Sequence, residues 1–513
     1  MAQTIVEYMQ EHGGYRCGYC GGTDTNFSHG MWAHSLSCED YQDLIDRGWR
    51  RSGSYLYKPL MDKMCCPCYT IRCAALDFQP SKSQKKVLKK MLRFLTTGER
   101  PKTSEGSSED PGASEPVETG EHPGTMREPH RRLTVPETIQ PGDDPAKPTE
   151  GSQEPIANNQ GETMSTTTTD QDMDSERVRD TSAQEEMPSA KKQPRPGLGA
   201  DLSKPPCKKA KEMRRQRRLE RRMQSMTGPP PPAPALATDK KPSNQPKSLE
   251  QLIQEIEDAS PPGSKHKLEM RYVRSSPSSA QFEASFEESY AIYHRYQVTV
   301  HKDPPTKPSR KQFRRFLVDS PLKAEHPPGL PEAGYGSFHE HFLLDGKIIA
   351  VGVIDVLPRC LSSVYFYYNP DYSFLSLGTY SALRELRYTR ALHLQMPSLE
   401  YYYMGFYVHS CAKMRYKGHY HPSYLLCPEA YTWCPIRPCL PKLDASKYSR
   451  LDETDAADTS VHLPDVRILY RQMSMRYSDY QQFAPRGEDE AEVREYAQFV
   501  GRICAGRMLL YRH

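Results

Sequence analysis

The sequence lacks aromatic residues across its middle. None of its 14 Phe, 3 Trp and 32 Tyr lies between Phe94 and Tyr272, a stretch that is rich in Pro, Glu, Ser and Thr. Burial of aromatic and branched side chains offsets the entropy lost on folding, so this stretch cannot build a hydrophobic core. The absence predicts two ordered domains, residues 1–97 and 246–513, joined by a disordered linker over residues 98–245.

The sequence also lacks long apolar runs. No segment approaches the roughly 18 apolar residues that a membrane-spanning helix needs. The first residues, MAQTIVEYMQEHGG, have neither the basic nor the apolar region of a secretion signal. We therefore expect a soluble protein that is not secreted and has no membrane partner. In such a chain the 14 Cys are expected to bind metal rather than to form disulfides.

Charge of one sign is not in excess either. The 69 Lys and Arg against 65 Asp and Glu leave a formal net charge of +4, which does not by itself indicate nucleic-acid binding. Positive charge is instead gathered in short segments. Residues 201–226 hold ten Lys and Arg against three acids, and the run at 208–222 suits a nuclear import address or an RNA-binding arm.

A second basic segment closes the first domain. Apolar residues recur there at helical spacing, at Val87, Leu88, Met91, Leu92 and Leu95. The spacing predicts a helix that Ser83 caps and Gly98 ends. The other face carries five cations, Lys85, Lys86, Lys89, Lys90 and Arg93. This face is either simply solvated or contacts RNA phosphates.

Two cysteine pairs predict a metal site in the first domain. Cys17 and Cys20 have the C-x2-C spacing of a metal-binding turn, and Cys65 and Cys68 repeat it. Spacing alone therefore favours Cys68 over the adjacent Cys66 as the fourth ligand, because neighbouring side chains diverge. Zinc or an iron–sulfur cluster fits four thiolates, and a set of buried thiols without metal is the alternative.

The last domain has an α/β (α+β) pattern. Ser248 and Gln251 form a capping box, and a half-buried strand follows at 267–273. Residues 336–344 and 347–358 predict two strands joined by a type I′ turn at Asp345 and Gly346. A third strand at 363–368, a helix at 375–394 and a fourth strand at 401–410 complete the order strand, strand, strand, helix, strand. A helix before the last strand favours a parallel pair.

Several long stretches resemble one known family, the eukaryotic arginyl-tRNA–protein transferases. The matching stretches include YRCGYCGG, CCPCYTIRC, QPSKSQKKVLKKMLRFL, GYGSFHEHFLLDGKIIAVGVIDVLP and YYYMGFYVHSCAKMRYKGHYHPSYLLCP. They cover most of both ordered domains and none of the linker. The resemblance implies transfer of arginine from arginyl-tRNA to the α-amine of proteins that begin with Asp, Glu or oxidised Cys. It also implies a role in N-terminal-residue-dependent degradation and a cytoplasmic and nuclear location. The sequence leaves the oligomeric state open, with a monomer favoured.

The resemblance also implies a ligand set and a fold. The family's metal-binding cysteines map onto Cys17, Cys20, Cys65 and Cys66, with Cys68 and Cys73 as nearby alternatives. The catalytic domain is similar to the acyl-CoA N-acetyltransferase fold. In SFLSLGTY, however, Gly378 stands alone where that fold has a Gly-rich pyrophosphate loop, so coenzyme A is not expected. Ser376, Leu377 and Gly378 are instead expected to contact the terminal adenosine or the arginyl ester.

The chemistry implied by these substrates requires a proton acceptor and a cation. Aminoacyl-tRNA is already an activated ester, so neither ATP nor a covalent enzyme intermediate is needed. The candidate proton acceptors on the matching strands are His339, Asp355, Tyr367 and Tyr368. The candidates for binding the acidic acceptor are Arg415 and Lys417, with Arg384 and Arg387 as the competing choice. RNA contact is expected at the basic helix and at Trp49, Arg50 and Arg51, with core packing as the alternative for the tryptophans Trp32 and Trp49.

Two other functions compete with this interpretation. A noncatalytic zinc-ribbon adaptor that binds RNA would explain the cysteines and the basic segments, but it leaves the last domain without a role. A coenzyme A-dependent N-acetyltransferase would use that domain, but the sequence lacks the Gly-rich loop.

Overall fold

The computed structural model describes residues 3–100, 140–141, 213, 216–217, 219–220, 247–328, 333–454, 461–483 and 489–512. The chain divides into two compact units, one formed by residues 1–146 and 246–513 and the other by residues 147–245. The predicted disorder over 98–245 and the basic run at 208–222 lie almost wholly outside the described residues. No helix in the described part is long and apolar enough to cross a membrane.

The first sheet brings the two ends of the chain together. Its strand order is β3 (Arg50–Ser52), β4 (Tyr55–Pro59), β2 (Asn26–Ser35), β1 (Ile5–Tyr15), β16 (Leu509–Arg512), β14 (Arg467–Tyr470), β15 (Met473–Arg476) and β6 (Gln140–Pro141). β1 runs parallel to β16, with Ile5 opposite Leu509. The first and last strands of the chain are therefore neighbours.

The second sheet carries the predicted catalytic domain. Its strand order is β13 (Trp433–Pro435), β12 (Ser423–Leu426), β5 (Tyr69–Ala74), β11 (Tyr401–Tyr407), β10 (Cys360–Tyr368), β9 (Lys347–Val356), β8 (Gly336–Leu344) and β7 (Leu268–Ser276). β5 comes from the N-terminal segment and pairs antiparallel with both β11 and β12. The two predicted domains therefore share both sheets, and their limits as domains stay a prediction.

The predicted order of strands and helix is confirmed in this sheet. β8, β9 and β10 are followed by α7 (Leu377–His393) and then by β11. β11 runs parallel to β10, with Cys360 opposite Tyr401. Asp345 and Gly346 have φ of 51° and 81°, the two positive values that a type I′ turn requires. The chain thus has a mixed α/β fold with two sheets.

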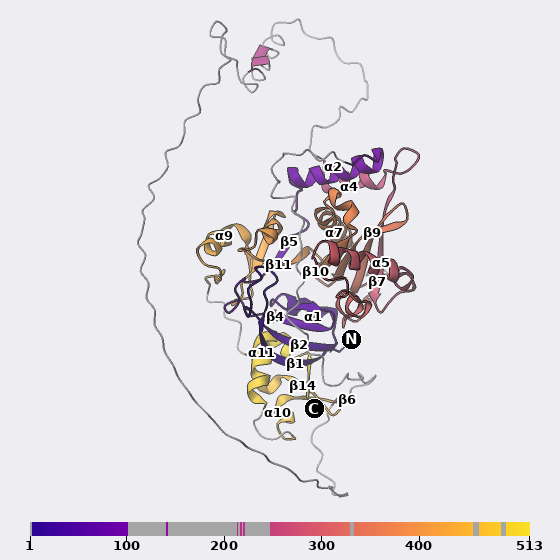
Figure 1. The fold of residues 1–513 in the computed structure, drawn as a ribbon. Helices are drawn as coiled ribbons and strands as arrows, with labels where there is room; N and C mark the ends of the chain where they lie inside the picture. The colour runs from indigo at the N-terminus through magenta and orange to yellow at the C-terminus, as the bar shows by residue number, and fades with distance from the viewer. Residues whose placement is uncertain are drawn as a thin grey trace, which may run out of the picture. The chain divides into compact units, whose positions relative to one another are not determined.

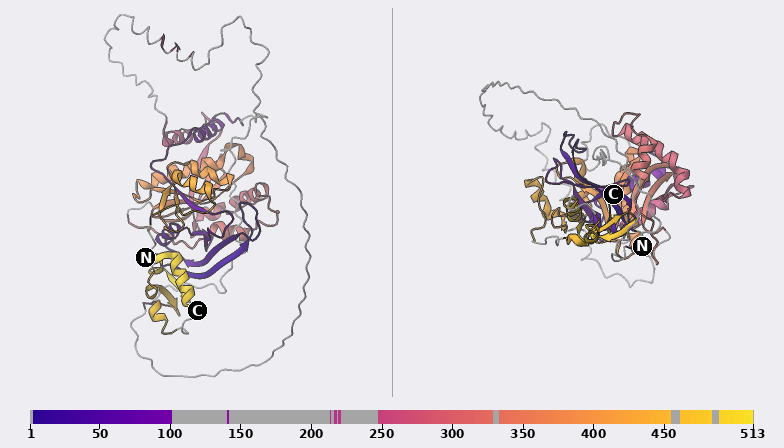
Figure 2. Two further views of the ribbon diagram at one scale, coloured as in Figure 1. Left: turned by 90° about the vertical axis from the view of Figure 1, so that its left-hand side faces the viewer. Right: turned by 90° about the horizontal axis from the view of Figure 1, so that it is seen from below.

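Helices cover the two sheets. They are α1 (Cys38–Ile45), α2 (Lys82–Thr97), α4 (Leu249–Glu257), α5 (Ala280–Thr299), α6 (Arg310–Phe313), α8 (Ala412–Arg415), α9 (Ile436–Ala445), α10 (Tyr477–Tyr480) and α11 (Glu490–Ala505). A π-helical turn η1 (Arg314–Val318) and the 3-10 turns η2 (Pro370–Leu375), η3 (Tyr416–His419) and η4 (Leu463–Asp465) complete the described elements. Figures 1 and 2 show α2 and α4 side by side, packed against the helical layer that contains α7.

The caps of these helices follow the sequence closely, with one correction. Ser248 and Gln251 form the predicted capping box at α4. Gly98 ends α2 in the left-handed conformation with a φ of 70°. The N-cap of α2 is Ser81 rather than Ser83, because Ser81 accepts the backbone N–H of Gln84 while the Gln84 side chain accepts that of Ser81. Such a reciprocal pair satisfies two donors, whereas Ser83 satisfies neither.

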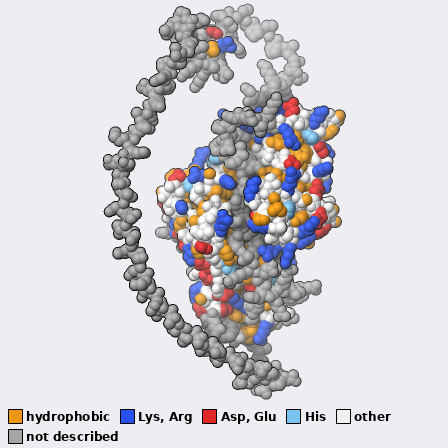
Figure 3. Space-filling model, in the orientation of Figure 1, with side chains coloured by type: hydrophobic (Ala, Val, Ile, Leu, Met, Phe, Trp, Pro, Cys, Tyr) orange, Lys and Arg blue, Asp and Glu red, His pale blue; other side chains and the backbone are white. Residues whose placement is uncertain are grey.

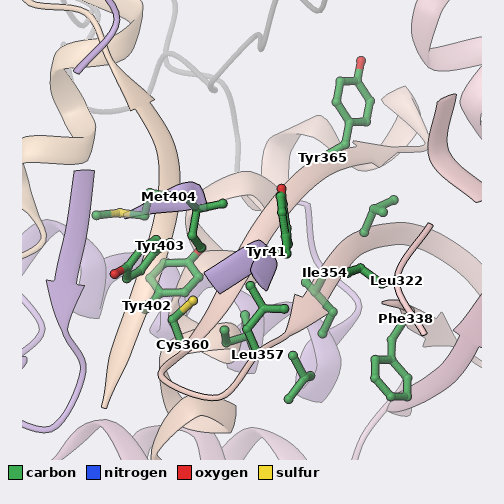
Figure 4. Packing of buried hydrophobic residues seen from close by; sticks show 14 of the residues in the cluster. Tyr41, Leu322, Phe338, Ile354, Leu357, Cys360, Tyr365, Tyr402, Tyr403 and Met404 are labelled. Atoms are coloured by element: carbon green, nitrogen blue, oxygen red, sulfur yellow. The ribbon is translucent and has the colours of Figure 1, made fainter. Parts of the chain in front are cut away.

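The hydrophobic core joins the two sequence segments. Tyr41 of α1 lies beside Leu357, Cys360, Tyr402 and Tyr403 in one buried cluster, which Figure 4 shows from close by. Burial of a large apolar side chain contributes about 1.5 to 3 kcal/mol, so a core built from both segments ties them together. The same core supports β11, whose end positions the site described next.

Candidate active site and cysteine cluster

Four cysteines form a cluster at the end of the N-terminal segment. The Sγ atoms of Cys17, Cys20, Cys65 and Cys66 all lie within 4.8 Å of one another. Cys20 and Cys65 are 3.4 Å apart, and the backbone N–H of Tyr19 donates to the Sγ of Cys17. Gly21, left-handed with a φ of 77°, follows Cys20 and closes this turn by donating its backbone N–H to the carbonyl of Cys17. Four thiolates at this spacing suit a metal ion or a small cluster.

The structure brings Cys66 into the cluster and leaves Cys68 outside it. The Sγ of Cys68 donates to the carbonyl of Cys66, and burial raises the pKa of this thiol to about 12. The backbone N–H of Gly22 donates a hydrogen bond to Cys20 and is the main reason that the pKa of this thiol falls to about 7. A hydrogen bond with the Cys65 side chain is the second cause. The ligand set that the family resemblance implied is therefore the set that the geometry assembles, and the spacing argument for Cys68 is wrong.

The cysteine cluster packs against the end of β11. Cys17 and Cys66 share an apolar cluster with Phe406 and Val408, and with Met414 on α8. The segment from β11 through α8 and η3 then continues into the pocket described below. The cysteine cluster and this pocket therefore contact the same segment of the chain.

A groove lies between α2 and the start of α7. A cavity of about 180 Å³ is lined there by Ser81, Ser83, Gln84, Lys86, Val87, Lys90, Ser376, Thr379, Tyr416, His419 and Tyr420. The ammonium of Lys90 donates to the Oγ of Ser376 over 2.9 Å. The residue before α7, Ser376, is left-handed with a φ of 56°, and no side chain caps the helix. The basic helix and the predicted substrate residues therefore meet in one groove.

The cations of α2 differ in exposure. Lys86, Lys89 and Arg93 are exposed, whereas Lys85 and Lys90 are half-buried. Lys85 donates to the carbonyl of Lys247. Elsewhere on the face shown in Figure 3, Lys and Arg side chains are interspersed with acidic and apolar ones. Lys86, Lys89 and Arg93 therefore form a local set of exposed cations on α2.

An inner pocket adjoins this groove. It has a volume of about 40 Å³ and is lined by Ser363, Phe366, Gly378, Ser381, Ala382, Glu385, Tyr402, Met404, Tyr416, Lys417 and Tyr420. Tyr416 and Tyr420 line both spaces. Lys417 is 2% exposed, and its ammonium group donates hydrogen bonds to the carbonyls of Met404 and Phe406. The pocket thus contains a carboxylate and an ammonium among aromatic rings.

The four candidate proton acceptors are all buried. His339 bonds to the carbonyl of Leu317, and burial lowers its pKa to about 4. Asp355 accepts two bonds from Arg51 at 2.7 Å each. The hydroxyls of Tyr367 and Ser289 are 2.6 Å apart, and Tyr368 packs in the core. None of the four lines the groove or the inner pocket, so their catalytic role stays a prediction that their burial does not favour.

The Trp49-Arg50-Arg51 corner lies in the interior. Trp49 is 0% exposed and donates its Nε1–H to the carbonyl of Phe499. Arg50 is 7% exposed and stacks over the ring of Phe406, 5.3 Å from its centre. Arg51 is occupied by Asp355. RNA phosphates cannot reach such groups without unfolding, so burial favours the core-packing alternative here.

The remaining cations divide between surface and interior. Arg415 is exposed and donates to the carbonyl of His409. Arg384, 4% exposed, and Arg387 both pair with Glu257, at 2.8 and 2.9 Å. Of the four arginine and lysine candidates for the acidic acceptor, only Lys417 lines the inner pocket.

Sequence reasoning missed the carboxylates near this pocket. Glu385 lines it from α7, and Glu340 is buried on β8 next to Glu385. Glu340 lies in the segment FHEHF. Side chains alternate between the two faces of a strand, so its side chain would be expected on only one face of an ordinary sheet. The sequence does not show that this strand is covered on both faces, whereas in the structure β8 is buried along its whole length.

Comparisons with known proteins match both ordered segments. The family model "Arginine-tRNA-protein transferase, N terminus" matches residues 15–86, and the model for its C terminus matches residues 288–427. The chain is 39% identical to "Arginyl-tRNA--protein transferase 1" of Drosophila melanogaster, covering 99% of each chain. It is 34% identical to "Arginyl-tRNA--protein transferase 2" of Arabidopsis thaliana, covering 91% of this chain and 81% of the relative. An "Aspartate/glutamate leucyltransferase" of Stutzerimonas stutzeri is 40% identical over 27% of this chain and 52% of its own.

Proposed function

Since the chain belongs to the arginyl-tRNA–protein transferase family, we propose that it transfers arginine from arginyl-tRNA to the α-amine of proteins with acidic N-termini. It is therefore a transferase enzyme. The observation that carries the proposal is the groove in which the basic helix α2, the start of α7 and the pocket with Lys417 meet. One end suits a nucleic acid, and the other suits an acidic residue.

The tRNA lies along α2 in this proposal. Lys86, Lys89 and Arg93 point to solvent and suit phosphate contact, which weakens steeply with added salt. Lys90 links this helix to Ser376, so the aminoacyl end of the tRNA reaches the start of α7. The first backbone N–H groups of a helix are unsatisfied donors, and here they face the carbonyl oxygen of the arginyl ester.

The acceptor occupies the inner pocket. An acidic side chain that leaves water is stable only beside a cation, and Lys417 is the cation of this pocket. Arg415, on the same segment but exposed, suits the residues that follow the first one in the acceptor. No ATP is needed, because the ester already carries the free energy of the new amide bond.

The cysteine cluster holds zinc or an iron–sulfur cluster in this proposal. The donor set supports it, because four sulfur atoms within 4.8 Å of one another match the ligand number of both groups. Such a centre stabilises the turn at Cys17 and Cys20 and the packing around Phe406.

The strand and helix order also supports an acetyltransferase-like catalytic fold, used here without coenzyme A. The basic run at 208–222 is proposed as a nuclear import address of a protein in both cytoplasm and nucleus.

One assay tests the proposal against its rivals. Labelled arginine on tRNA is offered with a peptide that begins with Asp, and the label in the peptide is measured. Transfer is expected for this peptide and not for one that begins with Gly. Binding of tRNA without transfer would favour the RNA-binding adaptor, and transfer of an acetyl group from coenzyme A would favour the acetyltransferase.

Substitution of Lys417 tests the acceptor pocket. Lys417→Ala removes a hydrogen-bonded charge pair worth about 1.5 to 3 kcal/mol, so the KM for Asp- and Glu-starting peptides should rise by roughly one to two decades. Arginyl-tRNA binding should stay nearly unchanged. Lys417→Glu should abolish the preference for acidic peptides. The matched control is Lys413→Ala on the neighbouring turn, which is exposed. If Lys417→Ala keeps wild-type kinetics with the peptides but binds tRNA more weakly, Lys417 contacts the tRNA and not the acidic acceptor.

A further inference from the structure

Two buried carboxylates meet behind the inner pocket. Glu340 of β8 is 0% exposed and Glu385 of α7 is 1% exposed. Gly352 of β9 lies between them, and a side chain there would begin 3.3 Å from Oε2 of Glu340 and 3.5 Å from Oε1 of Glu385. The glycine therefore leaves the space in which the two groups approach each other.

Each carboxylate also accepts a hydrogen bond from a hydroxyl group. The Tyr272 hydroxyl donates to Oε1 of Glu340 over 2.8 Å, and the Ser381 hydroxyl donates to Oε1 of Glu385 over 2.7 Å. Among the residues that the structure describes, Oε2 of Glu340 has no hydrogen-bond partner. A buried oxygen of this kind is costly as a charged acceptor, but as a hydroxyl it could donate toward Glu385.

Burial favours the protonated form of Glu340. Burial, and then the charge of Glu385, raise the pKa of Glu340 to about 8. Two adjacent buried carboxylates resist being ionised together, and the proposal below places the shared proton on Glu340. The titratable groups that surround the pair are Tyr272, Tyr380, Arg384, Tyr388, Tyr402, Lys417 and Tyr420. Arg384 is itself paired with Glu257.

Glu385 is the member of the pair that reaches the pocket. It lines the pocket together with Gly378, at the start of α7, and with Lys417. An acceptor that begins with Asp carries an amine and a carboxylate a few atoms apart. A pocket that holds an acidic and a basic group side by side is complementary to this arrangement.

We propose that Glu385 is the catalytic base of the transfer and that Glu340 is a positioning residue that keeps Glu385 ionised and oriented. This inference rests on the proposed function. The amine nitrogen attacks the ester carbonyl carbon and forms the C–N bond, while Glu385 takes a proton from the nitrogen. The ester C–O bond then breaks, and Glu385 returns the proton to the departing ribose oxygen. The products are an amide and free tRNA, with no net gain or loss of protons.

Single-turnover transfer of arginine to an Asp-starting peptide, measured from pH 6 to pH 9.5, tests this assignment. Glu385→Gln should lower the rate by about 10²- to 10⁴-fold, the usual contribution of a general base. Binding of arginyl-tRNA to this variant should stay at the wild-type level. Glu340→Gln cannot lose a proton, so its rate is compared with that of the wild type across the whole pH range. The matched control is Glu283→Gln, on an exposed ion pair with Arg314.

The pH profile separates positioning from mere structure. The peptide amine contributes the same titration to every variant, so the ratio of the Glu340→Gln rate to the wild-type rate reports on Glu340 alone. This ratio should be constant below about pH 7 and change above pH 8, where wild-type Glu340 loses its proton. A ratio that is flat over the whole range overturns the role of Glu340.

A second variant guards against misfolding of Glu385→Gln. Glu385→Asp retains the carboxylate and should recover part of the rate that the Gln variant loses. Equal rates in the two variants, or a Gln variant as fast as wild type, overturn the role of Glu385. Wild-type protein that fails to transfer arginine at all would instead overturn the proposed function.

Discussion

Cys66→Ser is expected to release the bound metal and to lower the melting temperature, whereas Cys68→Ser should keep the metal. Cys66 belongs to the group of four sulfurs, and Cys68, which lies outside it, donates to the carbonyl of Cys66. Structural zinc binding is worth about 10 to 16 kcal/mol in small domains, so losing one ligand should be among the largest effects in this chain. Metal content by atomic emission and melting by calorimetry measure both outcomes.

The control and the contradiction of this experiment are also defined by the structure. Cys73→Ser changes a buried thiol on β5 that is not in the group, and it should retain wild-type metal content. If Cys17→Ser and Cys66→Ser both keep their metal, the ligand assignment is wrong. Because Phe406 and Met414 pack on the cluster, metal loss should also weaken peptide binding next to Lys417.

Arg51→Ala is expected to destabilise the protein by about 3 to 5 kcal/mol, the cost of leaving one partner of a buried ion pair alone. Both side chains of the pair are essentially unexposed, and Ser337 donates a third bond to Asp355 at 2.7 Å. Removal of the guanidinium would leave the carboxylate charged, or force it to take up a proton. Urea unfolding of the purified protein measures this loss directly.

An exposed pair provides the comparison for Arg51. Arg93 and Glu99 pair at 2.8 Å on the surface, so Arg93→Ala should change stability by about 0 to 1 kcal/mol. The order is reversed for tRNA binding, because Arg93→Ala is expected to weaken it and Arg51→Ala is not. If Arg51→Ala has wild-type stability but binds tRNA poorly, this prediction is wrong and Arg51 contacts the nucleic acid.

Local signals in the sequence predicted local structure well. The Asp345-Gly346 turn and the capping box at Ser248 depend on neighbouring residues, and both are confirmed. The Cys17 and Cys20 turn is equally local. The choice between Cys66 and Cys68 was not local, because it depended on how the backbone after Cys65 places each side chain.

Long-range features of the fold could not be predicted from the sequence. No pattern within Tyr69–Ala74 indicates that β5 pairs with two strands more than 300 positions later. The burial of Arg51, and with it the loss of an expected RNA contact, depends on Asp355 from β9. Glu340 and Glu385 are ordinary acids until the fold places them side by side. Charge in a sequence suggests a surface, and only the tertiary structure shows which charges are enclosed.

The pairing of β1 with β16 has a consequence for how the chain is made. Ribosomes add about 5 to 20 residues per second, so the 513 residues take about 25 to 100 s to synthesise. Until the last residues are made β1 lacks its parallel neighbour, and until β11 and β12 are made β5 lacks the two strands that enclose it. The first sheet therefore cannot close before β16 has been synthesised. A message that ends early therefore yields a product with open strand edges, which chaperones and proteases recognise and which cannot act as a shortened enzyme.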